Sequence, residues 1–402
     1  MRIGIDARLL SQWGGGSSVF LRSIVRELER IDDENTYCLY SNRDFALPAP
    51  NPRWNKRISS GFLSVPGTLW LQTRAKRAAI ADGLDVFWGP GQALPLGLPP
   101  GLRKVLTVHD FVWRLYPETM GSYTYAIHNL FHERSIREAD KLIAVSQSTA
   151  RDLETLLQVP SSRVQVVYHG VCRQYHPRDQ KAAAQYVARQ FGTSENFIFS
   201  VGTIQPRKNL STLVEAIGIL RRNGHFPYQL LIAGGSGWKT SRIYASVKRC
   251  GLTDREVQFL GHVPEEDLPL LYSGARLFVF PSLYEGFGLP LVEAMSSGVP
   301  ILASDAPPVP EIVQDAAILV SPQSPQDFAN AIGRLLKDSA LSAHLVRRGL
   351  HRASQFRWDI AAKEVLRVFE EVYRNSELRR AARPLRTGDS RSVPPPTRGG
   401  TM

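Results

Sequence analysis

The chain has 402 residues and a formal net charge of +12, with 43% hydrophobic and 21% charged residues, a composition that fits two globular domains. Its three cysteines lie far apart without a Cys-x-x-Cys pair, which indicates neither a disulfide framework nor a zinc site and fits a reducing cytosol. No stretch reaches the about 18 apolar residues of a membrane span, and Asp6 stands where a signal peptide would be apolar, so we expect a soluble or peripheral cytoplasmic protein.

Apolar runs and helical patterns alternate over the first part of the chain. Runs typical of buried strands stand at residues 3–5, 84–87, 104–108, 142–145 and 164–168. Apolar residues that recur at three and four predict helices over residues 19–28 and 148–157. Because strand followed by helix is typical of parallel sheets, we expect residues 1–175 to form one Rossmann-like domain.

A second series of the same kind follows a polar linker at residues 172–195, where we place the hinge. Its strands are expected at residues 197–201, 229–233, 257–260, 277–280, 301–303 and 317–320. We therefore predict an α/β protein of two doubly wound parallel-sheet domains, the second at residues 176–355. Glycine and polar residues follow the carboxyl ends of strands in both domains, and ligands bind at that edge of open parallel sheets. Two such edges that face each other form a central cleft.

The C-terminal end divides into a helix and a tail. Residues 358–373 carry the apolar period of an amphipathic helix. Residues 376–402 are expected to be a disordered basic tail, because the chain from Arg374 onwards holds seven arginines, only two acids and no apolar period. We favour a solubilising extension over contact with an anionic membrane. Nucleic acid is not an expected partner, because no aromatic-interleaved basic strand or recognition helix accompanies the charge.

The most informative stretch follows the strand expected at residues 277–280. Two glycines there permit a tight turn, and a proline fits the first turn of a helix that begins near Leu289. The free N–H groups of that helix start, with the helix dipole, favour phosphate or sugar oxygens. Glu285 lies in the turn and Glu293 about one turn inside the helix, so the two carboxylates can flank one extended ligand. This arrangement indicates a sugar-nucleotide site.

The segment Glu-Gly-Phe-Gly-Leu-Pro-Leu-Val-Glu at residues 285–293, with Gly-Val-Pro and Ser-Asp downstream, resembles the Glu-x7-Glu signature of retaining glycosyltransferases of family 4, which have the GT-B fold. The resemblance covers most of residues 1–375. It implies a first domain that binds the acceptor, a second that binds the donor nucleotide, and a final helix at residues 356–375 that crosses back to the first domain. The alternative for the two glutamates is a solvated or capping position at a helix start.

The same resemblance gives the two glutamates different roles. It implies that Glu285 contacts the donor sugar near the reacting centre and that Glu293 accepts hydrogen bonds from the ribose diol, as two acceptor oxygens suit a vicinal diol. Four further residues are expected to line the donor site: Gly286, Phe287, Gly288 and Leu289.

Two adjacent cations, Arg207 and Lys208, follow the strand expected at residues 197–201. They suggest a clamp that stabilises the negative charge growing on a departing diphosphate without a metal or a cofactor. Family members usually carry an arginine shortly after the glycine that stands here as Gly202, and a lysine further on. Lys208 matches the lysine, whereas Thr203 occupies the arginine region and Arg207 is the candidate substitute. The alternative for both cations is a solvated first turn of a helix.

Three other places are candidates by resemblance. His109, at the end of a first-domain strand, resembles the family histidine that contacts hydroxyls of the donor sugar, with a packed or surface histidine as the alternative. The family's glycine-rich loop, where the backbone approaches the diphosphate and acceptor, corresponds to Gly14, Gly15 and Gly16, although triple glycine is also typical of plain loops. The nucleobase pocket is expected from Gly234, His262 and Val263.

The predicted function is transfer of a hexose from a nucleoside diphosphate sugar to a hydroxyl acceptor with retention. The blocks at residues 107–113 and 201–209 look most like bacterial mannosyltransferases of polysaccharide assembly. We therefore expect GDP-mannose as donor and a glycan or lipid-linked glycan as acceptor, at the inner face of the cytoplasmic membrane. A nucleotide-sugar epimerase would act without an acceptor, a phosphorylase would need phosphate, and a non-catalytic nucleotide-sugar sensor would bind the donor without turnover.

Overall fold

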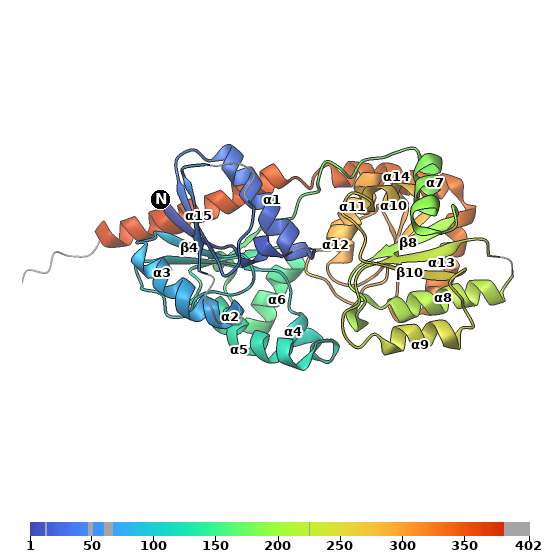
Figure 1. The fold of residues 1–402 in the computed structure, drawn as a ribbon, viewed down its shortest axis with the longest axis horizontal. Helices are drawn as coiled ribbons and strands as arrows, with labels where there is room; N and C mark the ends of the chain where they lie inside the picture. Colours follow the sequence, from blue (N-terminus) through green and yellow to red (C-terminus); the bar gives the residue numbers. More distant parts are fainter. Residues whose placement is uncertain (13, 47–50, 60–66, 225, 382–402) are drawn as a thin grey trace, which may run out of the picture.

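Two parallel β-sheets with helices on both faces form the two lobes of the molecule (Figure 1), a computed structural model that describes residues 1–12, 14–46, 51–59, 67–224 and 226–381. The first sheet has the strand order β3-β2-β1-β4-β5-β6-β7. Its strands are β1 (Arg2–Asp6), β2 (Thr36–Ser41), β3 (Trp54–Ile58), β4 (Val86–Gly89), β5 (Arg103–Val108), β6 (Lys141–Ala144) and β7 (Val164–Val166).

Sequence reasoning predicted five of these seven strands. It missed β2, which mixes aromatic and polar residues, and β3, an edge strand whose middle residues are exposed. It also began β4 two residues early, because Leu84 precedes the strand although it is buried in the core.

The second sheet has the order β10-β9-β8-β11-β12-β13, and each of its strands was predicted. They are β8 (Phe197–Val201), β9 (Gln229–Ala233), β10 (Val257–Gly261), β11 (Leu277–Phe280), β12 (Ile301–Ser304) and β13 (Ile318–Val320). Strands that are buried on both faces have continuous apolar sequences, so the strands of this sheet could be predicted from the sequence.

The helices lie on both faces of the two sheets and along the connection between them (Figure 1). In the first domain they are α1 (Gly16–Ile31), α2 (Gly67–Trp70), α3 (Lys76–Ala81), α4 (Val112–Leu115), α5 (Ser122–Glu138) and α6 (Gln147–Leu157). The others are α7 (Gln180–Phe191), α8 (Leu210–Arg222), α9 (Ser241–Arg249), α10 (Leu268–Gly274), α11 (Leu289–Ser297), α12 (Val309–Val313), α13 (Pro325–Lys337), α14 (Ser339–Ala353) and α15 (Trp358–Ala381).

Helix α15 returns from the second lobe and packs on α1 and the first sheet (Figure 1). Its Phe369 ring lies 5.5 Å from that of Trp88 on β4. The helix continues beyond the expected end at residue 375, because the buried Val372 and Ser376 extend its inward face at a spacing of four. The first six residues of the expected tail are therefore helical, and residues 382–402 lie outside the described part of the chain.

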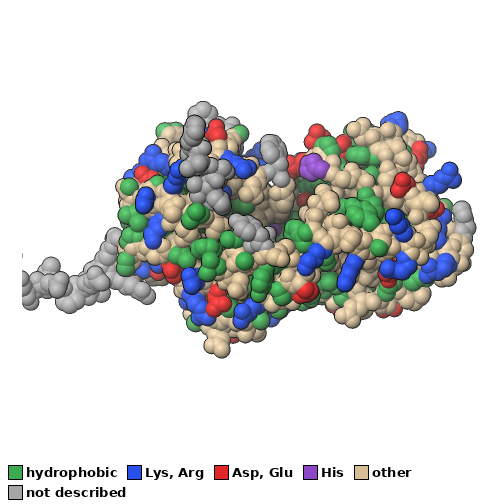
Figure 2. Space-filling view, turned by 60° about the horizontal axis from the view of Figure 1, so that its bottom comes forward, with side chains coloured by type: hydrophobic (Ala, Val, Ile, Leu, Met, Phe, Trp, Pro, Cys, Tyr) green, Lys and Arg blue, Asp and Glu red, His purple; other side chains and the backbone are tan. Residues whose placement is uncertain are grey.

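Strand order reverses between β1 and β4 in the first sheet and between β8 and β11 in the second. Ligands of open α/β sheets bind beyond the carboxyl ends of strands at such switch points. The turn that carries Glu285 follows β11, the two cations follow β8, and His109 follows β5. The fold thus sends the candidate residues of both domains toward the junction of the lobes, where the space-filling view shows a hollow (Figure 2).

The surface view in Figure 2 shows Lys and Arg side chains scattered over both lobes, not gathered in one stripe. A single basic stripe is the footprint of nucleic-acid binding, and this face lacks one. Within the described ranges, none of the helices combines the length and the apolar character that a membrane span requires.

Candidate active site

The turn between β11 and α11 places Glu285. Gly288 takes a left-handed backbone (φ 93°) and caps α11, which begins at Leu289 as predicted. The helix ends at Gly298, again left-handed at φ 72°. Left-handed glycines thus bound α11 at both ends, and Gly288 sets the turn beside the free N–H groups of the helix start.

Glu285 is held by the two predicted cations. Lys208 Nζ lies 2.5 Å from its Oε1, and Arg207 Nη1 lies 2.5 Å from its Oε2. All three side chains are largely buried, and Glu285 is 8% exposed. Burial alone would raise the pKa of the Glu285 carboxyl, but the charges of Arg207 and Lys208 outweigh burial and lower it to about 2. The carboxylate is thus ionised at neutral pH.

The cations reach Glu285 because of the loop after β8. Residues Pro206–Lys208 form a short 3-10 turn, and Asn209 follows in a left-handed conformation (φ 53°). The Asn209 amide donates to the carbonyl oxygens of Pro281 (3.1 Å) and Pro322 (2.7 Å), which ties this loop to the Glu285 turn. Thr203 is exposed, so the position that family members fill with arginine contributes no cation here.

Glu293 lies on α11 in a different environment. Its Oε2 accepts a hydrogen bond from the Tyr272 hydroxyl at 2.8 Å. Burial raises the pKa of the Glu293 carboxyl to about 7, and hydrogen bonds from Tyr272 and Tyr175 oppose the rise only in part. One glutamate of the motif is therefore a fixed anion, and the other titrates near neutral pH.

The first domain meets this turn at His109. Its Nε2 lies 2.7 Å from the Pro90 carbonyl oxygen, the ring is buried, and burial lowers its pKa. A Cβ atom added to Gly286 would collide with the His109 carbonyl oxygen, so only glycine fits between the domains there. The Leu289 side chain lies 3.6 Å from where a Cβ on Gly16 would be. The structure therefore brings both domains against the same turn.

Both domains match family models of glycosyltransferases. The model of "Glycosyltransferase Family 4" matches residues 14–174, and that of "Glycosyl transferases group 1" matches residues 185–352. O-antigen chain mannosyltransferase B of Escherichia coli is 31% identical over 305 residues, which are 75% of this chain and 78% of that protein. The chain belongs to the family 4 glycosyltransferases.

Other similarities of this glycosyltransferase are more distant. Serotype-specific mannosyltransferase WbdA of Escherichia coli is 28% identical over 300 residues, but the chain spans only 37% of its length. Sucrose-phosphate synthase from Thermosynechococcus elongatus superposes with a TM-score of 0.75 at 22% identity, covering 93% of this chain and 99% of that one. Anabaena HepE in complex with UDP-glucose gives 0.71 at 20% identity, with 92% and 99% covered. These structures confirm the GT-B fold.

Glycines of the glycosyltransferase bring the loops after β8 and β9 together at the carboxyl edge of the second sheet. A Cβ atom on Gly234 (φ 139°) would collide with the Gly202 carbonyl oxygen, and one on Gly202 (φ 146°) would lie 3.1 Å from the Lys208 side chain. Beyond β10, the predicted nucleobase residues His262 and Val263 follow, the first exposed and the second buried. Their role in binding stays a prediction.

Two predicted parts of the donor site, Phe287 and the glycine-rich loop, do not line it with side chains. The Phe287 ring is 3% exposed and packs 4.5 Å from the His169 ring, so only its backbone is available to a donor. Gly14 and Gly15 have φ values of 84° and 89°, and no described atom lies within 4 Å of a Cβ placed on either. These two glycines of the loop are therefore required by their backbone conformation and not by crowding from described atoms.

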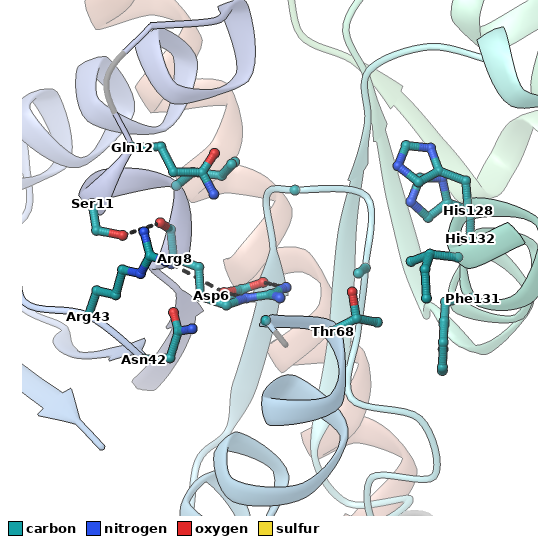
Figure 3. A pocket seen from close by; sticks show the side chains of 15 residues that line it. Asp6, Arg8, Ser11, Gln12, Asn42, Arg43, Thr68, His128, Phe131 and His132 are labelled. Atoms are coloured by element: carbon teal, nitrogen blue, oxygen red, sulfur yellow. Dashed lines mark hydrogen bonds and ion pairs between the residues drawn. The ribbon is translucent and has the colours of Figure 1, made fainter. Parts of the chain in front are cut away.

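The first domain of the glycosyltransferase has a pocket of about 310 Å³ beside the His109 turn (Figure 3). On its floor, Arg8 donates twice to the Asp6 carboxylate (Nε–Oδ1 2.8 Å, Nη2–Oδ2 2.6 Å). Its walls carry the side chains of Gln12, Asn42 and Thr68, which form no hydrogen bond with the described residues. On the far side lie the rings of His128 and His132, tilted by 37° with their centroids 4.0 Å apart. Gly91, next to the Pro90 that holds His109, also lines it.

Sequence reasoning missed two tyrosines of the glycosyltransferase that touch the motif. Tyr272 bonds Glu293, and Tyr284, which precedes Glu285, contacts the first domain through its hydroxyl. The position of Tyr284 beside the glutamate was visible in the sequence. Its partner Asp152 stands 132 positions away, where no spacing could point to it.

Proposed function

We propose that this glycosyltransferase transfers mannose from GDP-mannose to a hydroxyl of a glycan acceptor and retains the anomeric configuration. The observation that carries the proposal is the meeting of Arg207, Lys208 and Glu285 at the start of α11. A diphosphate that enters there meets two cations and the free N–H groups of a helix, which stabilise the charge that develops as the sugar leaves. Relatives named as mannosyltransferases support the choice of sugar.

Retention is proposed through the leaving group. Glu285 is bonded to two cations and ionised, which makes it a weak nucleophile. The nearby Asp110 carboxylate is also engaged, because it accepts a hydrogen bond from the Val112 N–H at 3.1 Å. We therefore assign neither carboxylate the role of a nucleophile that attacks the sugar. The departing phosphate oxygen would instead take the acceptor proton on the same face of the sugar, with His109 and Glu285 orienting the sugar and Glu293 the ribose. No metal is required in this scheme, so EDTA should leave turnover unchanged.

The acceptor is proposed to enter the pocket of Figure 3. Hydroxyl-binding groups line it, and Asp6 neutralises the charge of Arg8, which suits the uncharged hydroxyls of a saccharide. Peripheral contact with an anionic leaflet belongs to the same proposal, because a lipid-linked acceptor would be presented there. Co-sedimentation with anionic vesicles at low and high salt tests that contact.

Donor identity is tested by the melting temperature in the presence of nucleoside diphosphates and their sugars, since a ligand that binds only the native state raises it. GDP and GDP-mannose should give the largest shifts. A larger shift with UDP-glucose would replace the donor, and no shift with any would remove the proposal.

Glu285→Gln separates the enzyme from a sensor. This variant should bind GDP-mannose but release GDP at least about 100-fold more slowly than the wild type, the size of effect typical for one electrostatic stabiliser. An epimerase would instead change the donor sugar in the absence of any acceptor, which chromatography of the incubated donor detects.

A further inference from the structure

The Tyr284 side chain crosses from the second domain into the first. Its hydroxyl donates to Asp152 Oδ2 on α6 at 2.6 Å and accepts from the Phe111 backbone N–H at 3.1 Å. Tyr284 is 3% exposed, and the other buried members of its hydrophobic cluster come from residues 38–159 of the first domain. Tyr116 of that domain packs on it with ring centroids 5.7 Å apart.

The backbone of the same residue is fixed in the second domain. Arg207 Nη1 donates to the Tyr284 carbonyl oxygen at 2.6 Å, and the Leu283 N–H donates to the Arg207 carbonyl oxygen at 2.9 Å. Tyr284 is therefore bonded at its main chain to the loop that carries both cations, and at its side chain to the opposite domain.

The two ends of this link sit beside the two candidate reacting groups. Tyr284 directly precedes Glu285, and Phe111 follows His109 by two residues. Both hydrogen bonds of the hydroxyl form only when the domains are together, and a carboxylate acceptor makes the bond with Asp152 stronger than one between neutral groups. Burial raises the pKa of Asp152, and the Tyr284 hydroxyl opposes that rise.

We propose that Tyr284 is a positioning residue whose hydroxyl, held by Asp152 and the Phe111 N–H, aligns Glu285 with His109 as the domains close. The inference rests on the proposed function for the roles of Glu285 and His109. It adds a residue that touches no substrate but couples closure to the geometry of the reacting centre.

A second contact between the domains provides a control for closure itself. Glu311 on α12 accepts hydrogen bonds from the N–H groups of Gln147 (2.6 Å) and Ser148 (2.9 Å) at the start of α6, the helix that carries Asp152. Glu311→Ala should weaken domain closure and leave the hydrogen bonds of Tyr284 intact. Tyr186→Phe is the control for loss of a hydroxyl, because Tyr186 bonds Asp267 at 2.9 Å within the second domain.

The kinetic test measures total GDP release from GDP-mannose with methyl α-mannoside as the acceptor probe. Tyr284→Phe should lower kcat about tenfold and leave the KM for GDP-mannose within about twofold, since one charge-assisted hydrogen bond is worth roughly a factor of ten. Asp152→Ala should cause a similar loss, and the double variant no further loss, as expected for two ends of one bond. Tyr186→Phe should remain within about twofold of the wild type.

Three outcomes overturn the proposal: a kcat of Tyr284→Phe within about twofold of the wild type, losses that multiply in the double variant, or an equal loss in Glu311→Ala. A fourth readout is independent of substrate. Small-angle scattering of the free protein should give a larger radius of gyration for Tyr284→Phe than for the wild type and Tyr186→Phe. If GDP-mannose is not a substrate, the donor assignment fails, and equal radii for Tyr284→Phe and the wild type would then refute the inference separately.

Discussion

Lys208 Nζ and Glu285 Oε1 lie 2.5 Å apart, and Arg207 completes the cluster at the second oxygen of the same carboxylate. In the free protein, Glu285 therefore balances two buried cations that would otherwise be costly to hold. The diphosphate of a donor brings its own negative charge to these cations. Donor binding can thus loosen the hold on Glu285 and release its oxygens toward the sugar.

Lys208→Met tests the clamp. The variant keeps much of the buried volume and leaves Glu285 paired with Arg207, so we expect it to fold, while turnover falls by about 100-fold or more because charge on the departing diphosphate loses a stabiliser. GDP release from GDP-mannose gives the rate, and circular dichroism the fold. Arg249→Met, which breaks the exposed pair with Glu215, is the matched control and should change neither. Full activity of Lys208→Met would remove the clamp from the mechanism.

Acid stability should depend on Glu285. Its folded-state pKa is about 2 against an ordinary value of 4.5, so its ionisation stabilises the fold above pH 4.5, and this stabilisation is lost as the pH falls from 4.5 toward 2. The contribution is at most about 3.5 kcal/mol, because the pKa of the carboxyl falls from 4.5 to about 2 on folding. Glu285→Gln should be less stable than the wild type at pH 7, and the difference should shrink on acidification in urea melts at fixed pH. A constant difference between pH 7 and pH 3 contradicts the assigned charge state.

Glu293 should behave in the opposite way. Its folded-state pKa of about 7 lies above 4.5, so the wild type loses stability as the pH rises from 4.5 through 7, by at most about 3.5 kcal/mol. Glu293→Gln resembles the protonated form, so it should match the wild type near pH 4 and exceed it at pH 8. Thermal melts across this range decide the sign.

The same titration should appear in donor binding. The ionised carboxylate offers two acceptor oxygens to the ribose diol, so GDP-mannose should bind the wild type more tightly at pH 8 than at pH 6, by up to about tenfold. Calorimetry on Glu293→Gln should show a flat profile over that range. If both proteins show the same pH dependence, Glu293 does not accept hydrogen bonds from the ribose diol.

The sequence was sufficient for the features that depend on local order. Buried parallel strands such as β8 and β11 read as apolar runs, and the glycines and proline around Leu289 predicted where α11 begins. The exposed residues 55–57 made the edge strand β3 look like a loop. The sequence predicts where a single strand or helix lies, because the side-chain period of such an element depends only on neighbouring residues.

Contacts between segments far apart in the chain could not be predicted from the sequence. Arg207 and Lys208 were expected to face a diphosphate, but their pairing with Glu285 in the free protein joins segments 77 positions apart. The bond between Tyr284 and Asp152 likewise arises only when two sheets are packed together. Such pairs depend on domain orientation, which no motif encodes.

Gly286→Ala tests whether the domains must touch at the Glu285 turn. The added methyl group would collide with the His109 carbonyl oxygen, and because that atom belongs to a strand end it cannot move aside as a flexible side chain would. We expect the variant to fold, since each domain has its own sheet, but to stay more open, with a larger radius of gyration in scattering and at least about tenfold slower GDP release, a loss of the kind that small misplacements cause. Gly121→Ala is the control, because no described atom lies within 4 Å of a Cβ there and its φ is −74°. Wild-type activity in Gly286→Ala would mean that turnover does not require the approach of His109 to this turn.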